Sequence, residues 1–94
     1  MEKLVAKILK SAGNERRLMI LGFLYPNKEM TVSEISHRMR LSIKSVSRHL
    51  GKLENVGLIK KRQTSRWVFY SLNFDKKKPY NRCILDIVKK IQAR

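Results

Sequence analysis

The sequence predicts a mainly α-helical domain that also carries one small β-hairpin. Three observations support this fold class. Apolar residues recur at helical spacing in five segments, residues suited to helix caps precede several of these segments, and two short runs rich in β-branched and aromatic residues follow each other closely. At 94 residues the chain has room for one domain, covering residues 1–94.

The first part of the chain is predicted to form three helices. The first covers residues 2–12, where apolar positions repeat on one face. Asn14 is a suitable N-cap for the second helix, which should end before Pro26 because proline disfavours the α conformation in the preceding residue. Thr31 and Glu34 have the spacing of a capping box, which predicts the start of the third helix.

A tight turn and a fourth helix are predicted next. Residues 40–42 are too few for anything but a turn, and Ser42 can cap a helix over residues 43–55. Gly57 can adopt the left-handed conformation that ends such a helix. At about 100° per residue, one side of this helix is apolar and carries Ile43, Val46, Leu50 and Leu53.

The remaining elements are a hairpin and a last helix. Residues 58–63 and 66–72 are predicted strands, and the tip between them has no Gly or Asn, so we expect a wider loop than a two-residue turn. The last helix is predicted over residues 79–93. Three helices, a tight turn, a helix, a hairpin and a final helix are the order of a winged helix-turn-helix with five helices and a two-stranded wing.

The composition favours a polyanionic partner. There are 22 Lys and Arg against 7 Asp and Glu, a net charge of +15, which indicates nucleic acid. The longest apolar runs are too short to cross a membrane, and the first residues lack the apolar region of a signal peptide, so we expect a cytoplasmic protein. Two histidines without paired carboxylates or a nucleophile–base spacing predict neither an enzyme nor a cofactor site.

The side of the fourth helix opposite its apolar stripe is basic. Such a helix fits the major groove of double-stranded DNA, where Arg48 is the leading candidate to bond to a guanine, while Lys52 is expected on phosphate. Charged stripes are usually solvated faces. Recognition is favoured here because this stripe is wholly basic and lies between a helix-turn-helix turn and a basic hairpin. The residues predicted to contact DNA from this segment are Ser42, Lys44, Ser45, Ser47, Arg48, His49 and Lys52.

The hairpin is predicted to act as the wing. Lys60, Arg62 and Arg66 are expected on the DNA backbone or in the minor groove. Aromatic residues on strands could also stack on single-stranded nucleic acid. Packing is the favoured explanation, because a two-stranded hairpin needs apolar anchorage on the helices. The side chains expected to face the helices are Val68, Tyr70 and Leu72, with Trp67 and Phe69 on the other side.

Three segments resemble the ArsR/SmtB transcriptional repressors: residues 13–21, 41–50 and 65–72. The similarity covers roughly residues 10–72. It implies a dimeric, DNA-binding winged helix with its first and last helices at the dimer interface, and release of the operator when an effector binds. Lys44, Ser47 and Arg48 match groove-facing positions of the family. Ile43 departs from the family, which often has a polar residue at that position.

The metal-sensing part of the resemblance is missing. Metal-sensing members carry paired cysteines at the third helix, whereas residues 31–35 contain none, and the last helix has no histidine. Because transition-metal sites need several thiolate or imidazole ligands, no metal is expected. Redox-responsive members use two cysteines, and Cys83 is alone, which also excludes an intrachain disulfide.

The terminal helices are predicted to form a homodimer contact, because each has an amphipathic face that otherwise lacks a partner. Cys83 is expected to be a small buried hydrophobe at a helix interface, with an intersubunit disulfide or oxidation switch as the alternative. His49 is expected to pack or to contact phosphate. The residues predicted at the dimer interface are Leu4, Val5, Ile8, Cys83, Ile84, Ile87 and Ile91.

These observations predict a homodimeric repressor of double-stranded DNA. The main alternative is a sequence-tolerant architectural or coating protein, which the high positive charge makes reasonable and which would bind unrelated duplexes with steep salt dependence. A protein-interaction module is less favoured because the recognition face is basic. RNA is less favoured because an A-form major groove would not admit the helix.

Overall fold

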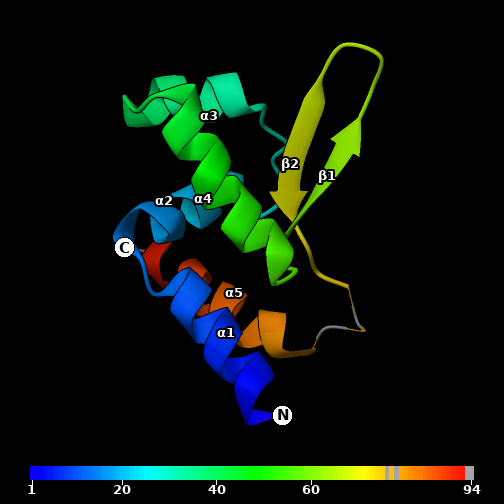
Figure 1. Cartoon of the computed structure of the whole chain (residues 1–94). Coiled ribbons are helices and arrows are strands. Elements are labelled where there is room, and N and C mark those ends of the chain that lie inside the picture. The colour runs from blue at the N-terminus through cyan, green and yellow to red at the C-terminus, as the bar shows by residue number, and fades with distance from the viewer. Residues whose placement is uncertain (76, 78, 93–94) are drawn as a thin grey trace.

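The computed structural model describes residues 1–75, 77 and 79–92, and the chain folds as five helices and a two-stranded hairpin (Figure 1). The predicted order of elements is confirmed; the predicted last residue of the final helix, Ala93, lies outside the described residues. No helix in the described segments has the length and apolar character needed to cross a bilayer. The elements are α1 (Glu2–Ala12), α2 (Glu15–Leu24), α3 (Val32–Met39), α4 (Ile43–Asn55), β1 (Ile59–Gln63), β2 (Val68–Leu72) and α5 (Pro79–Gln92).

The predicted caps fix where three helices begin. The Asn14 side chain accepts a hydrogen bond from the backbone N–H of Arg17 at 3.2 Å, at the start of α2. Thr31 and Glu34 form both halves of the capping box that opens α3. The Ser42 hydroxyl accepts from the backbone N–H three residues later, at the start of α4. Each cap satisfies an orphan donor and contributes about 1 kcal/mol.

The turn between α3 and α4 is fixed by local bonds around a left-handed residue. Arg40 has φ 56° and ψ 42°, a conformation that non-glycine residues adopt only at a cost. The backbone N–H of Leu41 donates to the carbonyl of Ser36 at 3.2 Å, and the buried Ser36 hydroxyl donates back to the Leu41 carbonyl. This pair of bonds sets the direction in which α4 leaves α3.

The end of α4 is joined to the wing and to α5. Gly57 has φ 78°, which confirms the predicted left-handed residue, and the N–H of Leu58 donates to the Leu53 carbonyl at 3.1 Å, as in a Schellman motif. The Gly57 carbonyl oxygen accepts from the side-chain amide of Asn73 at 3.0 Å and from that of the buried Asn81. Three elements therefore meet at one carbonyl group.

The hairpin is shorter than predicted and its loop is wide. The antiparallel strands pair from Ile59 with Leu72 to Gln63 with Val68, so the predicted strand residues 58, 66 and 67 lie outside them. A four-residue connection joins the strands, which confirms the expected wide tip. The Thr64 hydroxyl accepts from the N–H of Trp67 at 3.0 Å and holds this loop closed in place of a Gly-containing turn.

A third extended segment fastens the wing to the body. Met30 and Tyr70 exchange backbone hydrogen bonds of 3.0 and 2.8 Å, so the chain just before α3 pairs with the outer edge of β2. Tyr70 packs against the core and Leu72 is buried, as predicted. The extra pairing extends a hairpin that would be marginal by itself.

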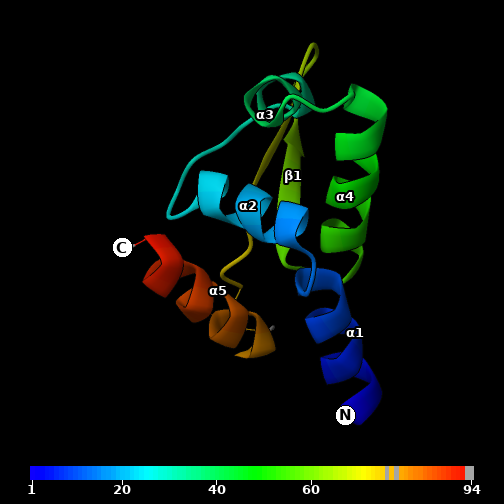
Figure 2. The same cartoon turned by 90° about the vertical axis from the view of Figure 1, so that its left-hand side faces the viewer.

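The terminal helices lie side by side below α2, and they pack partly within the chain (Figure 2). Ile8 of α1 and Ile84 of α5 are buried in the core. The premise that each amphipathic face lacks a partner within the chain is therefore wrong, because α5 packs against both α1 and α2, whereas the dimer contact itself stays a prediction. Leu4, Ile87 and Ile91 remain exposed, at 48%, 51% and 38%.

Candidate nucleic-acid interface

Helix α4 has one buried and one basic side. Val46, Leu50 and Leu53 are fully buried and attach the helix to the core. The opposite side carries exposed Lys44, Ser47, Arg48 and Lys52, with Ser45 half-buried beside them. The predicted division of α4 is thus present, with its basic side exposed and its apolar side buried. This arrangement suits insertion into a groove lined by acceptor atoms.

Ile43 is the exception to the predicted apolar stripe. Its side chain is 52% exposed, whereas the expectation placed it with Val46 and Leu50. Ile43 is the first residue of α4 and does not belong to the core cluster, although Val46 in the same turn is fully buried. The N-terminal end of α4 therefore presents an apolar side chain beside Lys44 and Ser47.

His49 is held by a contact that sequence spacing does not reveal. Its Nδ1 accepts a hydrogen bond from Nε of Arg17 at 3.2 Å, across 32 positions of the chain. Burial lowers the pKa of His49 below 6.5, and the positive charges of Arg17, Arg16, Lys52 and Arg48 lower it further. The ring is therefore neutral at pH 7, and Nε2 carries its hydrogen. A neutral ring in this orientation can donate to a phosphate oxygen.

A basic depression continues the positive surface from α4 onto α1 and α2. It has a volume of about 410 Å³, and its lining includes Lys7, Lys10, Arg17 and Lys52 but no carboxylate among the described residues. Arg17 crosses its wall, because it also donates to the Ser11 carbonyl at 3.1 Å. Neither Lys7 nor Lys10 was predicted as a site residue, since their helix was assigned only to dimerisation.

The wing cations divide between two faces of the hairpin. Lys61 turns toward α4, where its Nζ lies 3.7 Å from a carboxylate oxygen of Glu54. Lys60 and Arg62 alternate with it along β1 and therefore project from the outer face. Arg66 is exposed in the loop at the tip. Of the three predicted wing contacts, Arg66 is the one that lies in the loop between the strands.

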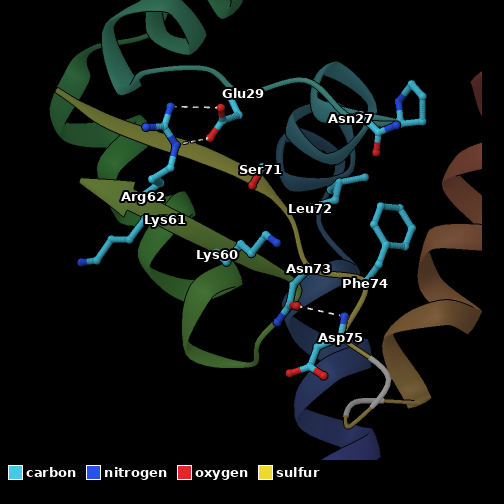
Figure 3. A pocket seen from close by; sticks show the side chains of 11 residues that line it. Asn27, Glu29, Lys60, Lys61, Arg62, Ser71, Leu72, Asn73, Phe74 and Asp75 are labelled. Carbon is cyan, nitrogen blue, oxygen red and sulfur yellow. Dashed lines mark hydrogen bonds and ion pairs between the residues drawn. The ribbon is translucent and has the colours of Figure 1, made fainter. Parts of the chain in front are cut away.

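Arg62 is bound to a partner within the chain. Its Nε and one terminal nitrogen donate to the two carboxylate oxygens of Glu29 at 2.9 and 3.1 Å (Figure 3). Its guanidinium also lies 4.9 Å from the ring centre of Phe69. This hydrogen bonding lowers the pKa of Glu29 and raises that of Arg62. A phosphate group of DNA would have to compete with Glu29 for Arg62. The local sequence could not indicate this ion pair, because the two residues are 33 positions apart.

An open pocket of about 810 Å³ lies on this outer face of the wing. Figure 3 shows the Glu29–Arg62 pair at one end, Phe74 and Asp75 at the other, and the Lys60 side chain between them. The pocket mixes both signs of charge, so it does not extend the wholly basic surface of α4.

The isolated sequence candidates fall outside any cluster. Cys83 is exposed, so within the single chain the expected burial is wrong. His37 is also exposed, on α3. Among residues 1–75, 77 and 79–92, no three His, Cys, Asp or Glu side chains come together in a way that could hold a metal ion.

Comparison with known proteins gives a consistent answer. Residues 14–61 match the family model described as bacterial regulatory protein, arsR family. The transcriptional activator HlyU of Vibrio cholerae is 45% identical over 76 residues, which are 78% of this chain and 69% of that protein. The transcriptional repressor PagR of Bacillus anthracis is 34% identical over 68 residues, or 72% of this chain and 68% of that protein.

The fold is shared as well. The structure of reduced HlyU from Vibrio cholerae superposes with a TM-score of 0.80 at 30% identity, covering 99% of this chain and 93% of that one. The match includes both terminal helices and the wing, because almost the entire chain is aligned.

Proposed function

The chain belongs to the ArsR family of bacterial regulatory proteins, and we propose that it is a homodimeric, sequence-specific repressor that binds double-stranded DNA. The observation that carries this proposal is the exposed basic side of α4, with Lys44, Ser47 and Arg48 together on a helix anchored through its other side. In each subunit α4 enters a major groove, and Arg48 forms a bidentate contact with a guanine.

Phosphate contacts surround this recognition helix. Ser42 and the first-turn amides of α4 face one phosphate, since a helix N-terminus attracts anions. His49, Lys52 and the basic depression at α1 and α2 line the path of the backbone on the other side. Arg66 at the wing tip reaches backbone or minor groove. Arg62 joins them only when it leaves Glu29.

The second subunit covers the exposed remainder of the terminal helices. Leu4, Ile87 and Ile91 expose apolar surface on α1 and α5, with Val5 half-buried and Cys83 exposed in the same elements. Ile8 and Ile84 support this surface from within the core. A two-fold dimer then presents two α4 helices to half-sites about 34 Å apart, one turn of DNA. Metal ions are expected not to release the DNA.

Selection of duplexes from a random pool, at two salt concentrations, tests the proposal. A palindromic consensus with half-sites one turn apart, enriched at both salts, is the expected result. A reporter gene under a promoter overlapping that consensus should be less active when the protein is present. Tight binding of unrelated duplexes with steep salt dependence and no enrichment would instead support the alternative, a sequence-tolerant coating protein.

Three variants separate base reading from charge. Arg48→Ala should lose about 1–3 kcal/mol on the consensus and relax the preference at one base position of each half-site. Arg66→Ala should weaken binding evenly across sequences and reduce the salt slope by about one. Lys89→Ala, which removes an exposed charge from α5, is the matched control and should leave the consensus unchanged. Intact specificity in Arg48→Ala would show that another residue reads that base.

A further inference from the structure

Ile43 is an apolar side chain placed where the recognition helix begins. It is 52% exposed, and among the exposed large apolar side chains of the described residues it is the one on α4. The fold gives no reason for an isoleucine there, because the side chain stands outside the core cluster. Single exposed apolar residues are ordinary on protein surfaces. This one is distinguished by its neighbours, which are basic or hydroxylated.

The orientation of Ile43 follows from helix geometry. Ser47 lies four residues later, so the two side chains are stacked on nearly the same line, and Lys44 lies about 100° around the helix. Helical side chains also lean toward the N-terminus of their helix. Ile43 therefore extends from the leading end of α4, on the edge of the surface formed by Lys44, Ser47 and Arg48.

Resting on the proposed function, we propose that Ile43 recognises a thymine in each half-site through the 5-methyl group of the base. In the major groove this methyl is the apolar feature that separates thymine from the other bases. When the Ile43 side chain contacts this methyl group, apolar surface of both the protein and the base is removed from water. If Ile43 covered a polar base edge instead, the polar atoms of that base would lose their hydrogen-bond partners. A side chain without a methyl or larger apolar group could not make the same distinction.

Deoxyuridine tests this contact directly, because it lacks the methyl group and keeps the hydrogen-bonding edge of thymine. Each thymine of the selected consensus is replaced singly, and affinity is measured for the wild type, Ile43→Ser and Ile43→Val. For one thymine per half-site, the wild type should lose about fourfold in affinity, the factor expected for one buried methyl-sized group. Ile43→Val should keep most of this loss, and Ile43→Ser should bind both duplexes equally.

Two results would overturn the inference, and they differ from failure of the proposed function. If no deoxyuridine substitution weakens wild-type binding, or if the loss persists in Ile43→Ser, Ile43 does not read a methyl group although specific binding stands. If selection enriches no sequence at all, the proposed function and this inference fall together. Ile43→Ser should retain the wild-type circular dichroism and melting temperature, since its side chain lies outside the core.

Discussion

Gly51 lies on the exposed side of α4, within the helix, where glycine is an unfavourable choice. A Cβ built at this position meets no other heavy atom within 4 Å, so an alanine would fit without displacing anything. Glycine inside a helix is destabilising by roughly 0.5–1 kcal/mol relative to alanine. We therefore predict that Gly51→Ala stabilises the fold by about 1 kcal/mol, which corresponds to a melting temperature about 4–8 °C higher for a domain of this size.

The same substitution should weaken DNA binding. If α4 lies in the major groove as proposed, the added methyl group stands between its backbone and the bases, where glycine permits the closest approach. Thermal unfolding at fixed protein concentration and titration of the selected duplex measure the two effects separately. Gly13→Ala is the contrast, because a Cβ there would lie 2.9 Å from the Leu9 carbonyl oxygen and should destabilise the fold.

Either of two outcomes would refute this reasoning about Gly51. A lower melting temperature for Gly51→Ala would mean that this side of α4 is not free in the folded protein. A higher melting temperature with unchanged affinity would mean that the centre of the exposed face does not approach DNA closely, and the proposed docking of α4 would have to be abandoned.

Three further predictions concern charge and assembly. The pKa of His49 should lie below 6.5 when it is measured by NMR. Between about pH 7 and pH 5 the unfolded chain then binds more protons than the folded protein, so the free energy of unfolding should fall as the pH drops. The variant His49→Gln should flatten this pH dependence. The variant Glu29→Gln should release Arg62 from its ion pair and so raise the affinity for unrelated duplexes. The salt dependence of binding should become steeper by about one released counterion. An unchanged dependence of affinity on salt would exclude Arg62 as a phosphate contact. The variant Ile87→Glu should be a folded monomer in analytical ultracentrifugation. The control Phe74→Glu changes another exposed apolar residue and should remain a dimer. A dimer that survives Ile87→Glu would place the interface elsewhere.

The features that sequence predicted well are those determined within a few residues. Asn14 and Ser42 each accept a hydrogen bond from a backbone N–H three positions later. The bonds that end α4 at Gly57 span five residues or fewer. All the residues that form these caps can therefore be recognised within a short stretch of sequence. The two sides of α4 were predictable for a similar reason. Helical spacing alone separates its buried residues from its basic ones.

The features that sequence missed depend on contacts between distant segments. The bonds of Arg17 to His49 and of Glu29 to Arg62 join positions more than 30 apart, and nothing in the local pattern of either pair indicates its partner. The exposure of Ile43 was missed for a different reason. A helical projection gives the direction of a side chain but not whether core residues lie opposite it, and Ile43 lies outside the core cluster although Val46 in the same turn is fully buried.

The shared hydrogen-bond acceptor at Gly57 links parts of the chain that have separate proposed tasks. Its oxygen is held at once by Asn73, where the chain leaves the hairpin, and by Asn81, in the first turns of α5. A rotation of α5 against its counterpart in a second subunit would pull on the carbonyl group of Gly57, the residue whose backbone N–H donates to the Glu54 carbonyl at the end of α4. The distance between the two α4 helices on a duplex would therefore depend on the angle at which the subunits meet.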